Sequence, residues 1–266
     1  MKNRISTTFS DNKKKLITFV TGGDPDFETS KQIIEHLAIS GADIIEIGMP
    51  FSDPMADGPT IQLSSLRAIK KGMDLNKIFN ICENFRKKNN IIPLILMGYY
   101  NVIYHFGIDN FIKSREHVGV DGLIIVDLQP EEDSELLNKI QTKNIDLIRL
   151  VTPTTDENRL TTILKNASGF LYYVTITGIT GQQSAEIEQL SKSILKVKKL
   201  SNLPVVAGFG IKNATQVKKI CSFSEGVVVG SSIIKIIEES INNKISKDKT
   251  VYKIGKFVKS LSRAIN

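Results

Sequence analysis

The sequence has few of the residues that bind metals or form disulfide bonds. It contains three histidines and two cysteines, Cys82 and Cys221, which lie far apart without CxxC spacing. Neither a zinc site nor a disulfide framework is indicated. Residues 1–15 are polar and lack the apolar segment of a signal peptide, and no apolar run long enough to span a membrane follows. We therefore expect a cytoplasmic protein with no bound metal.

The positive charge of the chain lacks the pattern of a nucleic-acid-binding surface. The 266 residues include 35 Lys and Arg against 28 Asp and Glu, which gives a net charge of +7. The excess is mostly Lys, scattered along predicted helices, and no basic run is interleaved with aromatic residues. We interpret it as a solvated surface and expect no nucleic-acid partner. Linkers, low-complexity segments and short repeats are also lacking, so residues 1–266 are predicted to form a single domain.

Short apolar runs recur along the chain and predict eight β-strands, each followed by a turn and an amphipathic helix. The predicted strands are residues 15–20, 43–48, 92–97, 121–126, 146–150, 169–175, 203–207 and 226–229. Their near-continuous apolar composition indicates a parallel sheet with a covered outer face. Eight such units predict an α/β protein with a (β/α)8 barrel, the TIM-barrel fold. An open doubly wound sheet is the alternative, but the Gly-x-Gly-x-x-Gly typical of its first turn is absent.

The second predicted strand and the loop after it hold acidic residues in fixed positions. Glu46 interrupts the apolar run and would face the interior, where an unpaired carboxylate costs several kcal/mol. Three prolines and two glycines between residues 48 and 59 make the next loop stiff, and this loop carries Asp53 and Asp57. Two fixed carboxylates can divide acid–base work between them. The alternative is a structural acid together with a helix N-cap at Asp57.

Glycine clusters at the ends of the seventh and eighth strands predict a phosphate site. They are Gly-Phe-Gly at residues 208–210 and Gly230-Ser231. Glycine lets backbone N–H groups approach an anion closely, and Ser231 would begin a helix, where the dipole favours negative charge. Barrels of this kind often bind phosphate after these two strands. The alternative is a pair of tight turns and an ordinary Ser N-cap.

Other positions near the expected carboxyl ends of the strands allow two interpretations. Residues 177–185 are small, polar and rich in glycine, the composition of a mobile lid or of a plain surface connection. Tyr172 and Tyr173 must point to opposite faces of the sixth strand. Phe19 and Phe209 could line a site or simply fill the barrel.

One stretch carries a family resemblance. Glu46-x-Gly-x-Pro-Phe-Ser-Asp-Pro-x-Ala-Asp-Gly-Pro-Thr-Ile-Gln62 resembles the signature of the tryptophan synthase α subunit. Residues 19–25, 97–101, 120–122, 177–181, 207–211 and 229–231 also resemble segments of this family, so the likeness extends along nearly the whole chain. Gln129 and Val102 stand where the family often has proline.

The resemblance implies a (β/α)8 barrel that cleaves indole-3-glycerol phosphate to indole and glyceraldehyde 3-phosphate without a cofactor of its own. It also implies an α2β2 heterotetramer in which the β subunit carries pyridoxal phosphate. Glu46 and Asp57 resemble the catalytic pair. The resemblance further implies a substrate site formed by Phe19, Tyr172, Thr180, Gly181, Phe209, Gly210, Gly230 and Ser231, and a partner interface that includes Asp53, Met55 and Asn101.

The implied chemistry agrees with the placement of the two acids. Cleaving the carbon–carbon bond requires a proton on C3 of the indole ring, which puts positive charge on the ring nitrogen. Asp57 would stay ionised on its polar loop and stabilise that charge, whereas burial would raise the pKa of Glu46 toward neutral pH. Two other functions stay open at this point: a lyase that releases free indole without a partner, and a non-catalytic barrel that binds a phosphate ligand.

Overall fold

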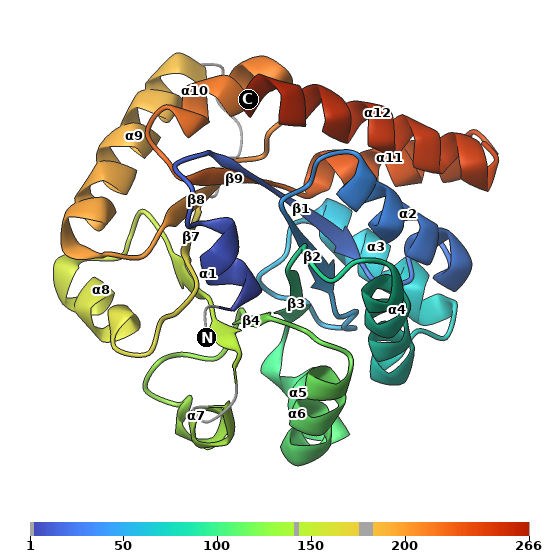
Figure 1. The fold of residues 1–266 in the computed structure, drawn as a ribbon, viewed down its shortest axis with the longest axis horizontal. Helices are drawn as coiled ribbons and strands as arrows, with labels where there is room; N and C mark the ends of the chain where they lie inside the picture. Colours follow the sequence, from blue (N-terminus) through green and yellow to red (C-terminus); the bar gives the residue numbers. More distant parts are fainter. Residues whose placement is uncertain (1–2, 141–143, 176–182, 266) are drawn as a thin grey trace.

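The computed structural model describes residues 3–140, 144–175 and 183–265, which form a ring of parallel strands surrounded by helices (Figure 1). The strands are β1 (Lys15–Thr21), β2 (Ile44–Gly48), β3 (Leu94–Gly98), β4 (Gly122–Ile125), β5 (Asp146–Leu147), β6 (Arg149–Val151), β7 (Leu171–Val174), β8 (Val205–Gly208) and β9 (Gly226–Val229). The helices are α1 (Arg4–Thr8), α2 (Phe27–Ile39), α3 (Pro59–Lys70), α4 (Leu75–Lys88), α5 (Tyr100–Phe106), α6 (Ile108–His117), α7 (Ser134–Ile140), α8 (Glu157–Leu164), α9 (Gln183–Leu200), α10 (Ala214–Cys221), α11 (Ser231–Asn242) and α12 (Lys247–Ile265).

The predicted barrel is confirmed, but its fifth strand is divided into two. The sheet order is β5-β4-β3-β2-β1-β9-β8-β7-β6, and every pair in it is parallel. β5 pairs with β4, β6 pairs with β7, and only Ile148 separates β5 from β6. The chain itself therefore closes the ring, and the described residues contain nine strands in place of the eight predicted.

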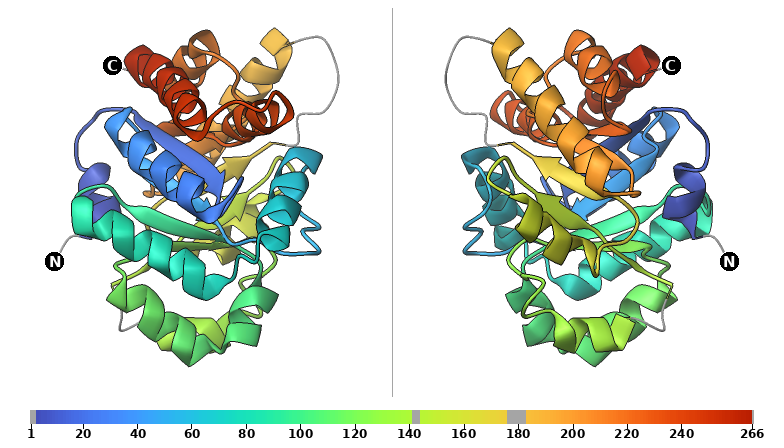
Figure 2. Two further views of the ribbon diagram at one scale, coloured as in Figure 1. Left: turned by 90° about the vertical axis from the view of Figure 1, so that its right-hand side faces the viewer. Right: turned by 90° about the vertical axis from the view of Figure 1, so that its left-hand side faces the viewer.

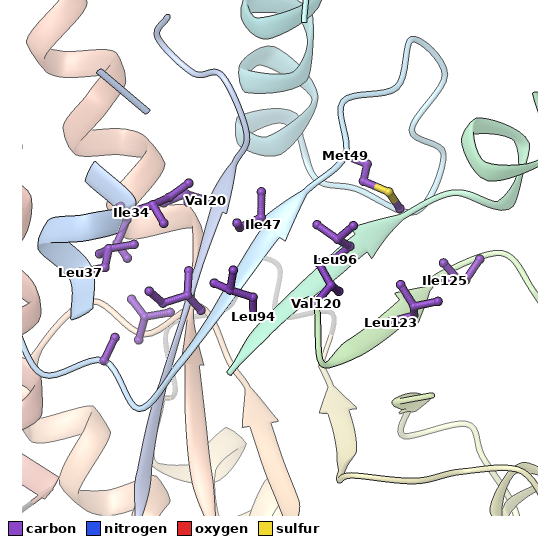
Figure 3. Packing of buried hydrophobic residues seen from close by; sticks show 14 of the residues in the cluster. Val20, Ile34, Leu37, Ile47, Met49, Leu94, Leu96, Val120, Leu123 and Ile125 are labelled. Atoms are coloured by element: carbon purple, nitrogen blue, oxygen red, sulfur yellow. The ribbon is translucent and has the colours of Figure 1, made fainter. Parts of the chain in front are cut away.

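Alternating residues of the strands divide the apolar core into two parts. On β1, Ile17 and Phe19 point into the barrel, whereas Leu16 and Val20 pack under the helices. The outer part is the larger one. Figure 3 shows Val20 of β1 beside Ile34 of α2 in it, with Ile47 of β2 and Leu94 and Leu96 of β3 on the strands further along the sheet. Strands that are apolar on both faces lack the polar–apolar alternation of a half-exposed sheet, which is why the sequence predicted a covered parallel sheet.

The N-terminal helix α1, which the sequence analysis did not predict, closes one end of the barrel. Figures 1 and 2 show it near the middle of the ring, at the side where the strands begin. Its only buried residue, Ile5, belongs to the inner core and has no exposed surface. Arg4 forms an ion pair with Asp121 at the start of β4 (2.7 Å). Because α1 fills this end, a ligand must enter from the carboxyl ends of the strands.

Local sequence signals mark where two of the helices begin or end. Gly72 lies between α3 and α4 and has φ +72°, a conformation that favours glycine. Asp156 caps α8 by accepting a hydrogen bond from the N–H of Arg159 (2.7 Å). Within the described part of the chain, no helix is long and apolar enough to cross a membrane.

Candidate active site

A cavity of about 390 Å³ lies at the carboxyl ends of the strands and gathers most of the predicted site residues. Those that line it are Phe19, Asp57, Tyr172, Phe209, Gly210, Gly230 and Ser231. They come from β1, from the β2–α3 loop, and from β7, β8, β9 and the segments that follow them. Thr180, Gly181 and most of the predicted lid lie outside the described residues.

Glu46 lies inside the barrel next to this cavity. It is the register partner of Phe19 on β1 and of Ile95 on β3, both of which belong to the inner core. Its side chain has no exposed surface, and no described residue donates a hydrogen bond to either of its oxygens. Burial raises the pKa of Glu46 to about 8. A carboxyl group in this position holds its proton at neutral pH and can release it near that pH.

Tyr172 belongs both to the inner core and to the wall of the cavity. Its ring is buried in the inner core and also lines the cavity, whereas Tyr173 packs in the outer core, so the predicted opposite orientation is confirmed. Burial raises the pKa of Tyr172 well above its usual value, and the nearby charges of Glu46 and Asp57 add to this increase. Both acids therefore lie close enough to Tyr172 to act on it electrostatically.

Asp57 lies on the β2–α3 loop at the edge of the cavity. The hydroxyl of Tyr99 donates a hydrogen bond to its Oδ2 (3.0 Å), and the side-chain amide of Gln62 donates to its backbone carbonyl (2.8 Å). Partial burial raises the pKa of Asp57, and the bond from Tyr99 opposes that increase. Gly58 occupies the N-cap position of α3, and no side chain caps this helix. The alternative that Asp57 is a helix N-cap is therefore wrong.

Helix α3, which begins two residues after Asp57, is tied to the end of β1 and the turn that follows it. Arg67 donates from Nε and Nη2 to the two oxygens of Asp24, at 2.8 and 2.7 Å. Asp24 is buried, and burial raises its pKa although the contact with Arg67 opposes the increase. Hydroxyl groups of Thr21 and Ser64 make a second contact between the same two elements. These bonds fix the helix that follows the Asp57 loop.

The end of the cavity near α11 has the features of an anion site. Helix α11 begins at Ser231, and its first backbone bond runs from Ile233 to the carbonyl of Gly230 (2.9 Å), so the N–H groups before Ile233 precede the helical ladder. Gly230, not a serine, is the N-cap, and it makes no side-chain cap bond. Gly210 has φ +56°, which favours glycine. Unpaired N–H groups at a helix start are suited to a phosphate.

The residues expected at a partner interface lie on the surface, in segments that follow the carboxyl ends of β2 and β3. Met55 is 81% exposed, and Asp53 lies on the same exposed loop. Asn101, at the start of α5, lines a second cavity of about 270 Å³ together with Pro50 and Phe51 from the base of that loop. The structure thus brings Asn101 close to the start of the loop that carries the other two.

Comparison with known proteins identifies the family. The model of the tryptophan synthase alpha chain family matches residues 5–265. The chain belongs to this family. It is 35% identical to tryptophan synthase subunit alpha from Legionella pneumophila, with a TM-score of 0.92 over 100% of this chain and 99% of that one. The tryptophan synthase complex of Pyrococcus furiosus matches at 34% identity and a TM-score of 0.83, over 94% and 98% of the two chains. Tryptophan synthase from M. tuberculosis in its aminoacrylate-bound form matches at 26% identity and a TM-score of 0.87, with both chains fully covered.

The chain also has cavity residues that the sequence analysis did not single out. Five of them are apolar and lie mostly at inward-facing positions of strand ends: Ile61, Met97, Val126, Leu150 and Val174. Strand alternation counted from Phe19 and Glu46 would have placed several of them inside the barrel. Across the described part of this alpha chain, no group of three or more His, Cys, Asp or Glu side chains is arranged to hold a metal ion.

Proposed function

We propose that this chain cleaves indole-3-glycerol phosphate to indole and glyceraldehyde 3-phosphate, the alpha reaction of tryptophan synthase, and that residues 1–266 act as one catalytic domain. The observation that carries the proposal is the placement of Glu46. It is fully buried without a described hydrogen-bond donor, and it adjoins a cavity with Asp57 at one edge and the start of α11 at another. One ligand in this cavity would meet a neutral acid at Glu46, a carboxylate at Asp57 and an anion site at the start of α11.

Glu46 would carry the proton in this reaction. With a pKa of about 8 it is protonated at neutral pH, so it can give its proton to C3 of the indole ring. The carbon–carbon bond then breaks, and the hydroxyl on the neighbouring glycerol carbon becomes the carbonyl of glyceraldehyde 3-phosphate. The proton of that hydroxyl returns to Glu46, so the enzyme ends the cycle unchanged.

Asp57 and the glycine clusters would bind the two ends of the substrate. An ionised Asp57 beside the indole N–H stabilises the positive charge that forms there when C3 is protonated. Phe19 and Tyr172 supply aromatic surface to the indole ring. The N–H groups at Ser231 and the backbone near Gly210 would hold the phosphate together with Gly181, and Thr180 would belong to the wall or gate of the indole pocket.

The partner would be a β-type subunit, in an α2β2 heterotetramer, that receives the indole. Exposed Met55 and Asp53 next to the catalytic loop, and Asn101 beside its base, are suited to contact a second protein. Docking there could hold the Asp57 loop in its active position and raise the rate by population shift. The chemistry proposed for this chain uses only its own carboxyl groups, and pyridoxal phosphate would belong to the β partner.

The test is an assay of indole release from indole-3-glycerol phosphate by the full chain, with and without a β subunit. We expect slow release by the chain alone and a roughly 30–100-fold increase on docking, a coupling of ordinary allosteric size. Full activity without the partner would instead identify a stand-alone lyase. No turnover under either condition would reject the reaction and leave a barrel that only binds a phosphate ligand.

A further inference from the structure

Tyr99 connects strand β3 to the catalytic loop through its hydroxyl group. The residue follows β3 directly and is 2% exposed. Its hydroxyl donates to Oδ2 of Asp57 (3.0 Å) and accepts a hydrogen bond from the backbone N–H of Ala56 (2.9 Å). One phenol oxygen thus bonds both the side chain of Asp57 and the backbone N–H of the residue before it.

The two bonds together fix the direction in which the hydroxyl donates. A phenol has a single hydrogen to donate, and the N–H of Ala56 occupies an acceptor position of the same oxygen. The hydrogen is therefore directed at Asp57. Burial, with the charge of Asp57 adding to it, raises the pKa of Tyr99 well above its usual value. The phenol consequently remains a donor at any pH at which the enzyme works.

Tyr99 is itself held in place from two sides. Its ring packs against Phe51, with centroids 5.2 Å apart. The backbone directly after it is fixed by Asp127, whose Oδ1 accepts a hydrogen bond from the N–H of Tyr100 (2.8 Å). A rigid donor loses little entropy when it forms a bond, so its position can set the position of Asp57.

We propose that Tyr99 is a positioning residue for the lyase reaction: its hydroxyl orients the Asp57 carboxylate toward the substrate and favours the ionised form that stabilises the indole nitrogen. This inference rests on the proposed function of Asp57. Loss of the hydroxyl leaves the burial of Asp57 unopposed, so the pKa of Asp57 must rise and the acid limb of the rate profile must move to higher pH.

Other titratable groups face this pair and remain unchanged when only the hydroxyl is removed. Tyr172 on β7 feels the charge of Asp57 and of Glu46, and Asp127 acts on Tyr99 from the end of β4. Substitution of Tyr99 by Phe retains the ring against Phe51, so a shift of the acid limb reports the lost hydrogen bond and not a new charge.

The experiment compares Tyr99→Phe with Tyr100→Phe in the full chain, alone and with saturating β subunit. The hydroxyl of Tyr100 donates to Oε2 of Glu135 (3.0 Å), which is the same kind of bond outside the cavity. For Tyr99→Phe we expect kcat at pH 7 to fall by ~10-fold or more, as for loss of a hydrogen bond to a charged group, with KM little changed. The acid limb should move to higher pH, whereas Tyr100→Phe should match the wild type in both respects. An unshifted acid limb in Tyr99→Phe would overturn the proposal.

Two further measurements separate this proposal from the proposed function and from a folding defect. Tyr99→Phe introduced into an Asp57→Ala background should cost less than about twofold, because the bond it removes is already absent; an equal loss in both backgrounds would mark a structural role only and overturn the proposal.

The carboxyl of Asp57 can also be titrated by NMR, with Asp57→Asn identifying its signal. Its titration should occur at higher pH in Tyr99→Phe than in the wild type, even if the wild type proved to have no lyase activity. Identical titrations would overturn the proposal.

Discussion

Phe19 on β1 and Glu46 on β2 are partners in the parallel register, so an aromatic ring and a carboxyl group lie side by side in the barrel interior. The ring of Phe19 packs against glycine on two sides. A Cβ added to Gly48 would lie 2.7 Å from it, and a Cβ added to Gly230 would lie 3.1 Å from the Phe19 side chain. The glycines thus make room for the aromatic ring beside Glu46.

The burial of Glu46 predicts a specific dependence of stability on pH. Its folded-state pKa of about 8 exceeds the ordinary 4.5, so the folded state retains a proton that the unfolded state loses. The contribution of Glu46 to stability must therefore fall as the pH rises from about 4.5 and level off above about 8. Glu46→Gln removes this loss and should raise the free energy of unfolding by up to ~3 kcal/mol at pH 7 but by far less at pH 5.

Urea unfolding of wild type and Glu46→Gln at the two pH values tests this prediction. Glu132→Gln is a suitable control because Glu132 is exposed. Its unfolding free energy should follow the wild type at both pH values. An equal gain for Glu46→Gln at pH 5 and pH 7 would mean that the pKa of Glu46 is not raised.

Asp57→Asn should lower kcat far more than it raises KM. The charge that we propose Asp57 stabilises forms only as C3 is protonated, so loss of the carboxylate should affect the transition state and not the bound substrate. Steady-state kinetics with saturating β subunit measure both constants. A change confined to KM would make Asp57 a binding residue.

Gly230→Asp should weaken the binding of glycerol 3-phosphate by at least ~10-fold while the fold is retained. The new carboxylate would occupy the start of α11, where it competes with the phosphate for the same N–H groups and crowds Phe19. Calorimetric titration measures the affinity, and circular dichroism checks the fold. Unchanged affinity would place the phosphate elsewhere.

Arg67→Met should destabilise the protein by about 3 kcal/mol, because it leaves the buried carboxylate of Asp24 without its partner. The double variant Asp24→Asn with Arg67→Met should be more stable than Arg67→Met, since no buried charge then remains. Urea unfolding at pH 7 measures all three proteins. If the double variant is the least stable, the cost of Arg67→Met does not come from an unpaired carboxylate at Asp24.

The sequence predicted the barrel and much of its site because those features follow local rules. Continuous apolar strands separated by helices indicated the closed parallel sheet, and the position of Glu46 within such a strand placed it inside. The prolines around Asp57 indicated a fixed loop, and the glycines before Ser231 indicated the start of α11. Each of these features is encoded by residues that lie close together in the sequence.

Features that depend on distant contacts were not predictable in this way. Helix α1 is short and polar, and it is held by the packing of Ile5 in the barrel and by the ion pair of Arg4 with Asp121. The break at Ile148 arises where the two ends of the sheet meet. Tyr99 bonds Asp57, a residue 42 positions away. The inward and outward alternation of side chains along β3 does not predict that contact.

The central claim, that Glu46 carries the proton that breaks the carbon–carbon bond, is tested most directly by one rate. It is kcat for indole formation from indole-3-glycerol phosphate by Glu46→Gln, compared with the wild type, each with saturating β subunit. Gln retains the shape of the side chain but cannot cycle a proton, so we predict a fall of at least ~10²-fold. A rate within about threefold of the wild type would contradict the claim, since general acid–base catalysis contributes far more than that.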